Sequence, residues 1–180
     1  MFRRILALAC LLGSSGPGAR GAVDDPRECP GVCEQPIAYT LDDGFDGAQR
    51  ALLEQAMHAW ERGTGGRVCF APGGADLVVH KLERAEELSP WDPDWAAHIA
   101  LSKGGHIWIV DSTVSDPGEL RALGVHEIGH YLGLGHVEDT SLTYMHSRID
   151  DTPEELRKHA RLPERDGRDF CAAHRCTCAF

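Results

Sequence analysis

The chain has 180 residues, of which 42% are hydrophobic and 26% charged, as expected for one globular domain with a hydrophobic core. Its formal net charge of −10 argues against nucleic acids and anionic membranes as partners, because both repel an acidic surface. No hydrophobic run approaches the roughly 20 residues needed to cross a bilayer.

The N-terminal segment MFRRILALACLLGSSGPGARG has the layout of a secretory signal peptide. Arg3 and Arg4 form a basic start, residues 5–12 are hydrophobic, and small residues follow. We expect residues 1–21 to be removed, although no cleavage point fits the small-residue rule well, and residues 22–180 to form the mature domain. The sequence therefore predicts a secreted or periplasmic protein.

Removal of the signal peptide leaves six of the seven cysteines and makes the chain more acidic. The loss of two arginines changes the formal charge from −10 to −12, or to −13 if Arg20 is also removed. An even number of cysteines in an exported chain indicates disulfide bonds, and three bridges allow fifteen connectivities. A zinc site is the alternative, but the spacings CPGVC and CTC match no common zinc finger. The six cysteines are Cys29, Cys33, Cys69, Cys171, Cys176 and Cys178.

The first predicted elements are a strand and a long helix. In PIAYTLDD, residues 36–43, hydrophobic side chains alternate with other residues as in a half-buried strand. A helix is predicted to follow, because Asp46 and Gln49 have the spacing of a capping box and Gly63 offers a C-terminal stop.

Four more strands and a loop are predicted next. RVCFAP (67–72) and ADLVVHKL (75–82) have the composition of strands, whereas the acidic, proline-containing residues 82–95 indicate a long surface loop. Residues 96–111 then read as two short strands joined at residues 103–105.

Two further helices complete the predicted fold. The first is expected to begin near Ser115 or Asp116, because Pro117 suits the first helical position and Glu119 completes a capping box with Asp116. The C-terminal segment is helical in composition but is interrupted by Pro163. This order predicts an α+β domain with a mixed, twisted sheet of four to five strands, a long helix, a metal-binding helix and a C-terminal helix.

Residues 125–139, VHEIGHYLGLGHVED, lie on and just after the helix that begins near Asp116. His126 and His130 are four residues apart, so they project from the same helix face and can bind one metal ion. His136 can supply a third ligand if the chain turns sharply, and Gly133 stands where a left-handed residue would make that turn. Imidazole is a good zinc ligand, and a catalytic zinc needs three protein ligands and an open position for water.

Glu127 is the candidate general base of this site. It follows the first ligand directly and can reach the water that the metal activates rather than the metal itself. The alternative is that these histidines face solvent on a polar helix. Chance, however, would place HExxHxxGxxH in a chain of this composition only on the order of a few times in ten thousand.

The segment HEIGHYLGLGH resembles the zinc-binding signature of the metzincin metalloproteases and, within that clan, is most similar to the matrixins (peptidase M10). Met145 in SLTYMHS resembles the methionine turn that lies beneath the zinc in that clan. HIWIVD and LPERDGRDFCAAH are also similar to segments of a matrixin catalytic domain. The resemblance implies one catalytic Zn²⁺ held by His126, His130 and His136, with Glu127 as general base and a protein or peptide as substrate.

The chain departs from the matrixin pattern in two places. His146 and Ser147 follow Met145, where matrixins usually have a proline. His98 and His106 stand where matrixins carry two ligands of a structural zinc, but the other expected ligands, a His-x-Asp pair, are not present. We therefore expect both histidines to be exposed strand residues, and a second zinc or a calcium ion has no support in the sequence.

The prediction is an exported, monomeric zinc endopeptidase whose substrate lies extended along the strand at residues 96–101. One alternative is a metzincin-shaped binding or inhibitory module without catalysis, against which the intact Glu127 argues. A zinc hydrolase of non-peptide substrates is another. PRECPGVCEQP faintly resembles the cysteine switch of matrixin pro-segments, but we expect Cys29 and Cys33 to be disulfide-bonded instead.

Overall fold

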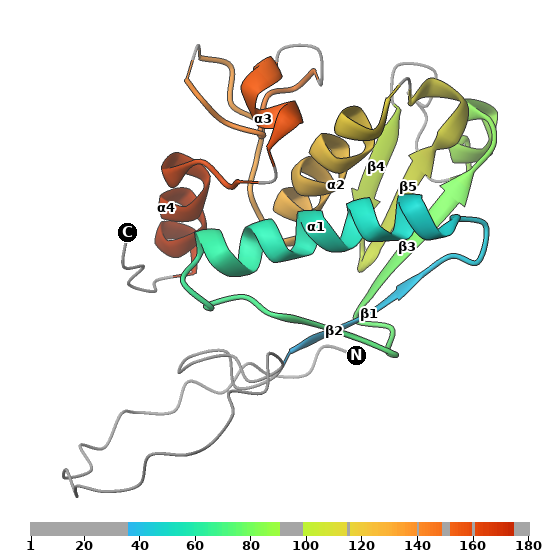
Figure 1. Ribbon diagram of the computed structural model, residues 1–180, viewed down its shortest axis with the longest axis horizontal. Coiled ribbons are helices and arrows are strands. Elements are labelled where there is room, and N and C mark those ends of the chain that lie inside the picture. Colours follow the sequence, from blue (N-terminus) through green and yellow to red (C-terminus); the bar gives the residue numbers. More distant parts are fainter. Residues whose placement is uncertain are drawn as a thin grey trace, which may run out of the picture.

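The computed structural model describes residues 36–90, 99–114, 116–139, 141–148, 152–159 and 161–174. Within these ranges the chain forms a five-stranded sheet and four α-helices (Figure 1). The elements in chain order are β1 (Ile37–Leu41), α1 (Gly47–Gly63), β2 (Phe70–Pro72), β3 (Leu77–Leu82), η1 (Ala85–Leu88), β4 (Ala100–Lys103), β5 (His106–Val110), η3 (Asp111–Thr113), α2 (Pro117–Tyr131), α3 (Glu154–Lys158) and α4 (Glu164–Ala173). The predicted α+β fold is confirmed.

The sheet has the strand order β2-β1-β3-β5-β4. Its first four strands are parallel, and β4 runs antiparallel to β5, to which it is joined by a short turn at Gly104 and Gly105. The predicted mixed sheet is therefore confirmed, and so is the predicted strand pair within the described residues 99–111, where β4 begins at Ala100. Strand β4 lies at one edge of the sheet, so one side of its backbone pairs with no other strand that the structure describes.

The helices α1 and α2 pack against each other and against the same face of the sheet (Figure 1). Helix α1 begins where the sequence predicts, because Asp46 accepts a hydrogen bond from the Gln49 amide and the Gln49 side chain accepts one from the Asp46 amide. The Trp60 side chain is fully buried, and its indole N–H donates to the carbonyl of Val125 at 2.9 Å. This bond ties α1 to α2 next to the predicted metal ligands.

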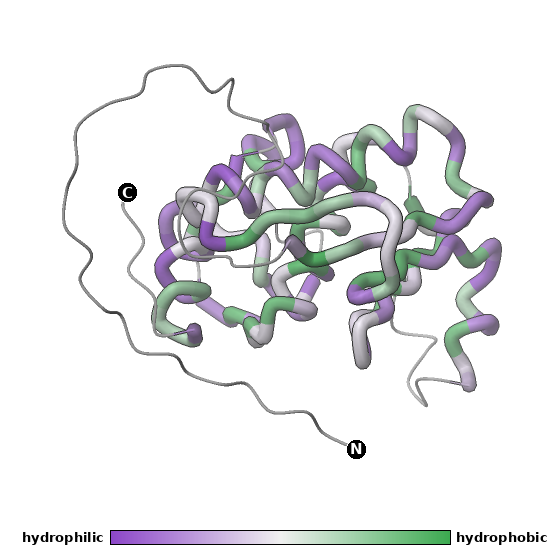
Figure 2. The backbone as a smooth tube through the Cα atoms, turned by 90° about the horizontal axis from the view of Figure 1, so that it is seen from below, coloured by the Kyte–Doolittle hydropathy of each residue, from purple (hydrophilic) through white to green (hydrophobic). Residues whose placement is uncertain are grey.

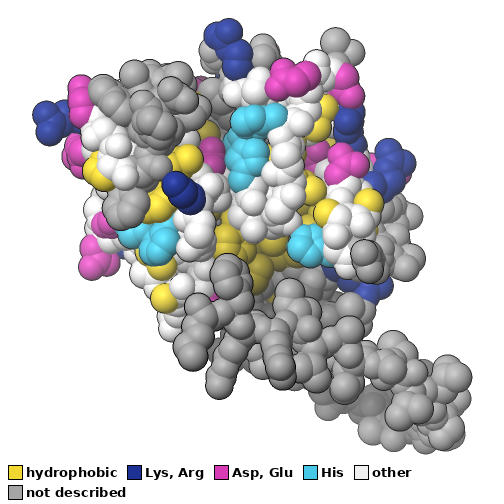
Figure 3. All heavy atoms as spheres, turned by 180° about the vertical axis from the view of Figure 1, so that it is seen from behind, with side chains coloured by type: hydrophobic (Ala, Val, Ile, Leu, Met, Phe, Trp, Pro, Cys, Tyr) yellow, Lys and Arg dark blue, Asp and Glu magenta, His cyan; other side chains and the backbone are white. Residues whose placement is uncertain are grey.

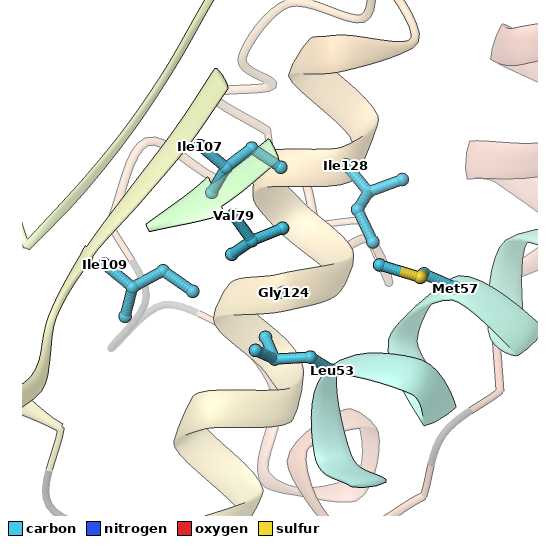
Figure 4. Close-up of a pocket in the computed structure, with 7 residues that line it drawn as sticks. All are labelled: Leu53, Met57, Val79, Ile107, Ile109, Gly124 and Ile128. Atoms are coloured by element: carbon cyan, nitrogen blue, oxygen red, sulfur yellow. The ribbon is translucent and has the colours of Figure 1, made fainter. Parts of the chain in front are cut away.

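The core between these helices and the sheet is closely packed. The hydrophobic residues gather along the strands, whereas the helices alternate between hydrophilic and hydrophobic residues (Figure 2). A cavity of about 10 Å³, too small to be useful for a ligand, lies where α1, α2, β3 and β5 meet (Figure 4). Its lining is entirely apolar and consists of Leu53, Met57, Val79, Ile107, Ile109, Gly124 and Ile128.

The opposite face of the sheet carries a second, smaller hydrophobic cluster. The expected surface loop after β3 contains the 3₁₀ helix η1, whose Leu88 is fully buried against Trp108 and Val110 of β5. His80, for which the sequence suggests no partner, lies 2.9 Å from His106 between their ring nitrogens. In the view from behind, several histidine side chains reach the surface beside hydrophobic ones (Figure 3).

The C-terminal part forms two helices, as the interruption at Pro163 predicts. Helix α3 ends before that proline, and α4 begins directly after it. Among the described residues, no helix combines the length and the apolar composition needed to cross a membrane.

Candidate metal centre

Helix α2 presents the candidate ligands, and both of its ends are set by local sequence. Asp116 is the N-cap, its carboxylate accepts a hydrogen bond from the Glu119 amide at 3.0 Å, and Pro117 occupies the first helical position. After the helix, Gly133 has φ +88°, a left-handed conformation that side chains other than glycine rarely adopt. This glycine makes the sharp turn that the position of a third ligand requires.

The turn brings His126, His130 and His136 together. The Nε2 atom of His130 lies 3.0 Å from Nε2 of His126 and 3.0 Å from Nε2 of His136. The three potential ligand atoms lie within 4.8 Å of one another, close enough to hold one metal ion. Zinc–nitrogen bonds of about 2.0–2.1 Å in a tetrahedral site imply separations of roughly 3.3 Å between ligand nitrogens, so the observed spacing fits zinc closely.

Two of these rings are oriented by backbone carbonyls. Nδ1 of His126 donates to the carbonyl of Tyr144 at 2.7 Å, and Nδ1 of His130 donates to the carbonyl of Leu134 at 2.9 Å. A carbonyl can only accept, so in the neutral rings the single proton is on Nδ1 and the lone pair is on Nε2. Burial lowers the pKa of His126 to about 4 and lowers that of His130, so both rings are neutral at pH 7. Converging lone pairs repel each other unless a cation lies between them.

Glu127 is the most heavily desolvated acid at this site. The residue is 4% exposed, and its Oε1 lies 4.0 Å from Nε2 of His126. Its other oxygen, Oε2, is buried without a hydrogen-bond partner. Burial raises the pKa of the Glu127 carboxyl to about 8. A carboxylate in such surroundings is unfavourable without a nearby positive charge, which a divalent ion held by the three histidines would supply.

Met145 packs against α2, the helix that carries two of the candidate ligands. It is 2% exposed, and a Cβ atom added to Gly129 of α2 would come within 2.4 Å of its sulfur. Glycine at position 129 therefore allows the methionine side chain to pack directly against the helix backbone between the two helical ligands. The carbonyl of Met145 also accepts a hydrogen bond from the Val137 amide at 2.7 Å, which connects this turn to the residue after His136.

A buried carboxylate that the sequence analysis did not single out supports this turn. Asp166 of α4 is 1% exposed, and it accepts hydrogen bonds from the hydroxyl of Thr143 and, at 2.9 Å, from the amide of Tyr144. The Thr143 hydroxyl accepts in turn from the Met145 amide at 2.9 Å. Asp166 thus fixes the peptide whose carbonyl orients His126. Its acidic neighbours in LPERDGRDF gave no signal that this particular carboxylate is buried.

The remaining candidate residues lie elsewhere or outside the described ranges. His106 is a strand residue of β5, as predicted, but it is half-buried rather than exposed, because it contacts His80 and Trp108. His98, Cys29 and Cys33 lie outside the described residues. His146, next to Met145, is buried, and its two ring nitrogens lie 3.2 and 3.1 Å from the carbonyls of Val137 and Ser141.

Comparison with known families agrees with this arrangement. The family model for matrixin (Peptidase M10) matches residues 84–168, a range that includes α2, the histidines and the methionine turn but not strands β1 to β3. No curated protein sequence matches the chain significantly.

Proposed function

We propose that this matrixin-like metzincin domain is an exported, zinc-dependent endopeptidase. The observation that carries the proposal is the convergence of three imidazole Nε2 atoms beside a buried carboxylate, Glu127, whose Oε2 has no partner. Three imidazole ligands would leave one position of a tetrahedral zinc open for water, as catalytic sites require. A structural zinc would have its four positions filled by protein side chains, so the donor set favours catalysis.

Each residue has a separate task in this mechanism. His126, His130 and His136 would hold the ion, which supplies a Lewis acid that polarises a carbonyl and makes water a nucleophile at neutral pH. Glu127 accepts a proton from the attacking water and passes it to the leaving amine. The surroundings of Glu127 support this role, because burial raises the pKa of its carboxyl and a divalent ion held by the three histidines would favour the carboxylate form that accepts the proton.

Strand β4 is the proposed platform for an extended substrate. It lies at the edge of the sheet and beside α2 (Figure 1), so a peptide added to its free edge would lie close to the helix that carries two of the candidate ligands. Of the proposed strand at residues 96–101, only Ile99 to Leu101 lies in the described ranges, and β4 begins at Ala100.

Export is proposed from the layout of residues 1–21 and from the cysteines. Of the six cysteines outside that segment, Cys69 and Cys171 lie in the described ranges, and both are buried and disulfide-bonded. Disulfides are stable in oxidising compartments, which supports the proposal.

Thiol titration of the unfolded, unreduced mature protein should find almost no free thiol. Two or more free thiols would instead favour a role for Cys29 or Cys33 as a cysteine switch.

We also propose that the protein is a monomer.

The rival proposal is a binding or inhibitory module that has lost catalysis. The presence of Glu127 opposes it, because a site without catalysis has no use for a buried carboxylate that is neither a ligand nor hydrogen-bonded at Oε2. A third possibility, hydrolysis of non-peptide substrates, would use the same metal centre. This hydrolase can be distinguished from the proposed endopeptidase only by the class of substrate that it cleaves.

Substitution Glu127→Gln tests the mechanism. It preserves the shape of the side chain but cannot accept a proton, so hydrolysis of casein or of a peptide library should fall by roughly 10²–10⁴-fold while zinc content is retained. Glu138→Gln is the matched control, because Glu138 is exposed and near the site. Equal activity in Glu127→Gln would disprove the mechanism. Zinc binding without cleavage of any peptide by the wild type would favour the binding module.

A further inference from the structure

A second site lies at the opposite end of α2, where α3 packs across the helix (Figure 1). An open cavity of about 440 Å³ lies between the two helices, which is within the range of roughly 300–1,000 Å³ typical of small-molecule sites. It is lined by Asp116, Gly118, Arg121, Glu154, Arg157 and Lys158. All of the lining residues except the glycine carry charged side chains, and three of the six are cationic.

The two helices are held close to each other around this cavity. The guanidinium of Arg121 donates to the carbonyl of Arg157, and a Cβ atom on Gly118 would come within 2.8 Å of that same carbonyl. A larger residue at position 118 would push α3 away from α2. The contact therefore holds the Arg121 guanidinium at the cavity and fixes the backbone of α3 at Arg157.

The charges around the cavity do not cancel one another locally. Glu154 and Lys158 form an ion pair at 2.6 Å, so they offset each other. The carboxylate of Asp116 accepts a hydrogen bond from the Glu119 amide as the cap of α2. Neither Arg121 nor Arg157 forms an ion pair with any carboxylate of the described residues. With Asp116 and Glu154 the cavity lining has two carboxylates against three cationic side chains, so its formal net charge is +1.

Both arginines also have an unused donor. The Nε atoms of Arg121 and Arg157 are buried and have no hydrogen-bond partner within the described part of the chain. Guanidinium groups retain their charge at all ordinary pH values, and a buried N–H without an acceptor costs free energy that an acceptor would recover. The acceptor best matched to two forked cationic donors is an oxyanion, because it offers several oxygens to both at once.

We propose that the cavity between α2 and α3 binds a phosphate or sulfate group, free or carried by a small molecule, through Arg121 and Arg157. The volume leaves room for more than the charged group itself, since one water occupies about 30 Å³ of liquid. This site uses none of the residues of the metal centre and goes beyond the proposed proteolytic function.

Isothermal titration of the zinc-loaded mature protein with sodium phosphate and, separately, with sodium sulfate tests the proposal at constant ionic strength. Saturable binding of at least one of the two ions is expected, and the ion that binds more tightly identifies which oxyanion the cavity prefers. Arg157→Gln should weaken that binding by about tenfold or more, because it removes a charge-assisted donor pair. Arg168→Gln is the matched control, since Arg168 is an exposed arginine of α4 that pairs with Glu164, and it should leave binding unchanged.

Circular dichroism without added anion establishes that each variant is folded. Arg157→Lys gives a second test if the glutamine variant does not fold, because it retains the charge but loses the planar fork and should bind more weakly than wild type. Binding of neither ion would overturn the proposal. So would binding that both Arg157 variants leave unchanged, since the ion would then be elsewhere, including at the zinc.

Discussion

The two ends of helix α2 differ in the buried polar atoms that lack a hydrogen-bond partner: an acceptor at one end and donors at the other. At its C-terminal half, Glu127 has a buried carboxylate oxygen without a partner, and a potential ligand nitrogen from each of three imidazoles lies beside it. At its N-terminal half, Arg121 and the neighbouring Arg157 each have a buried N–H without a partner. These account for three of the four buried, unpartnered side-chain polar atoms in the described residues, and Thr152 supplies the fourth.

The comparison shows how unsatisfied groups indicate the sign of a ligand. Buried polar atoms are normally hydrogen-bonded, so an exception requires an explanation. Acceptors and lone pairs gathered at one place favour a cation, whereas donors from permanently charged side chains favour an anion. At the metal end, Asp166 and two backbone carbonyls hold the surrounding residues in place. The cavity between α2 and α3, in contrast, has exposed residues along its rim.

The largest expected effect is at the metal end. His136→Ala removes the one ligand supplied from outside the helix, so zinc binding should weaken sharply and peptide hydrolysis should be lost. Elemental analysis of the wild-type protein should find one zinc per mature chain, removed by chelators and restored by added zinc. His174→Ala is a control, because this histidine donates to the carbonyl of Leu132 and lies outside the ligand set. The absence of zinc from carefully prepared wild-type protein would contradict the proposed zinc site at His126, His130 and His136.

A smaller effect is expected from the carboxylate behind the methionine turn. Asp166→Asn cannot accept from both the Thr143 hydroxyl and the Tyr144 amide, so the peptide that orients His126 should loosen. We expect zinc affinity to fall by about 10–100-fold, the usual range for groups that orient a metal ligand. Competition with a chromophoric zinc chelator measures it. Asp169→Asn, on the exposed side of α4, should bind zinc like wild type. Unchanged affinity in folded Asp166→Asn would show that the turn is held by other contacts.

The smallest effect concerns Tyr144, which connects the metal end to α3. Its hydroxyl donates to the carbonyls of Leu156 and His159, and burial raises its pKa from 10.0 to about 12. A raised pKa means that the unfolded chain ionises first. The stability contributed by this hydroxyl is therefore fully present below about pH 10 and is lost as the pH rises toward 12.

Tyr144→Phe should lower the free energy of unfolding by about 1 kcal/mol at pH 7. The difference from wild type should shrink between pH 10 and 12, and urea denaturation at each pH measures it. Tyr39, whose pKa is also raised to about 12, titrates in both proteins and so cancels in the difference. A difference that stays constant up to pH 12 would contradict the burial of this hydroxyl.

Much of the fold was predictable because its signals are local. Asp46 and Asp116 begin their helices as capping residues, and Gly133 and Pro163 mark turns through their own backbone preferences. Within the predicted surface loop, the burial of Leu88 was not predicted, and it has a tertiary cause. Acidic residues and prolines suggest an exposed loop, but Leu88 is buried because β5 presents Trp108 and Val110 to it.

The sequence by itself predicted the three histidines that the structure brings together at the candidate metal centre, and it proposed Glu127 as general base. A spacing of four residues on a helix places His126 and His130 on one face, and helix geometry requires no tertiary contact to do so. The turn at Gly133 extends the same reasoning to His136, since the preference of glycine for positive φ is also local.

Only the tertiary structure decided which other charged side chains are buried and which of them lie next to one another. Asp166 and Asp169 are both aspartates of α4, yet one is buried under the methionine turn and the other faces solvent. Arg121 and Arg157 are separated by 36 positions in the chain and meet only because α3 crosses α2 at Gly118. Burial and partners depend on contacts between residues distant in sequence, and no local pattern of residue types specifies them.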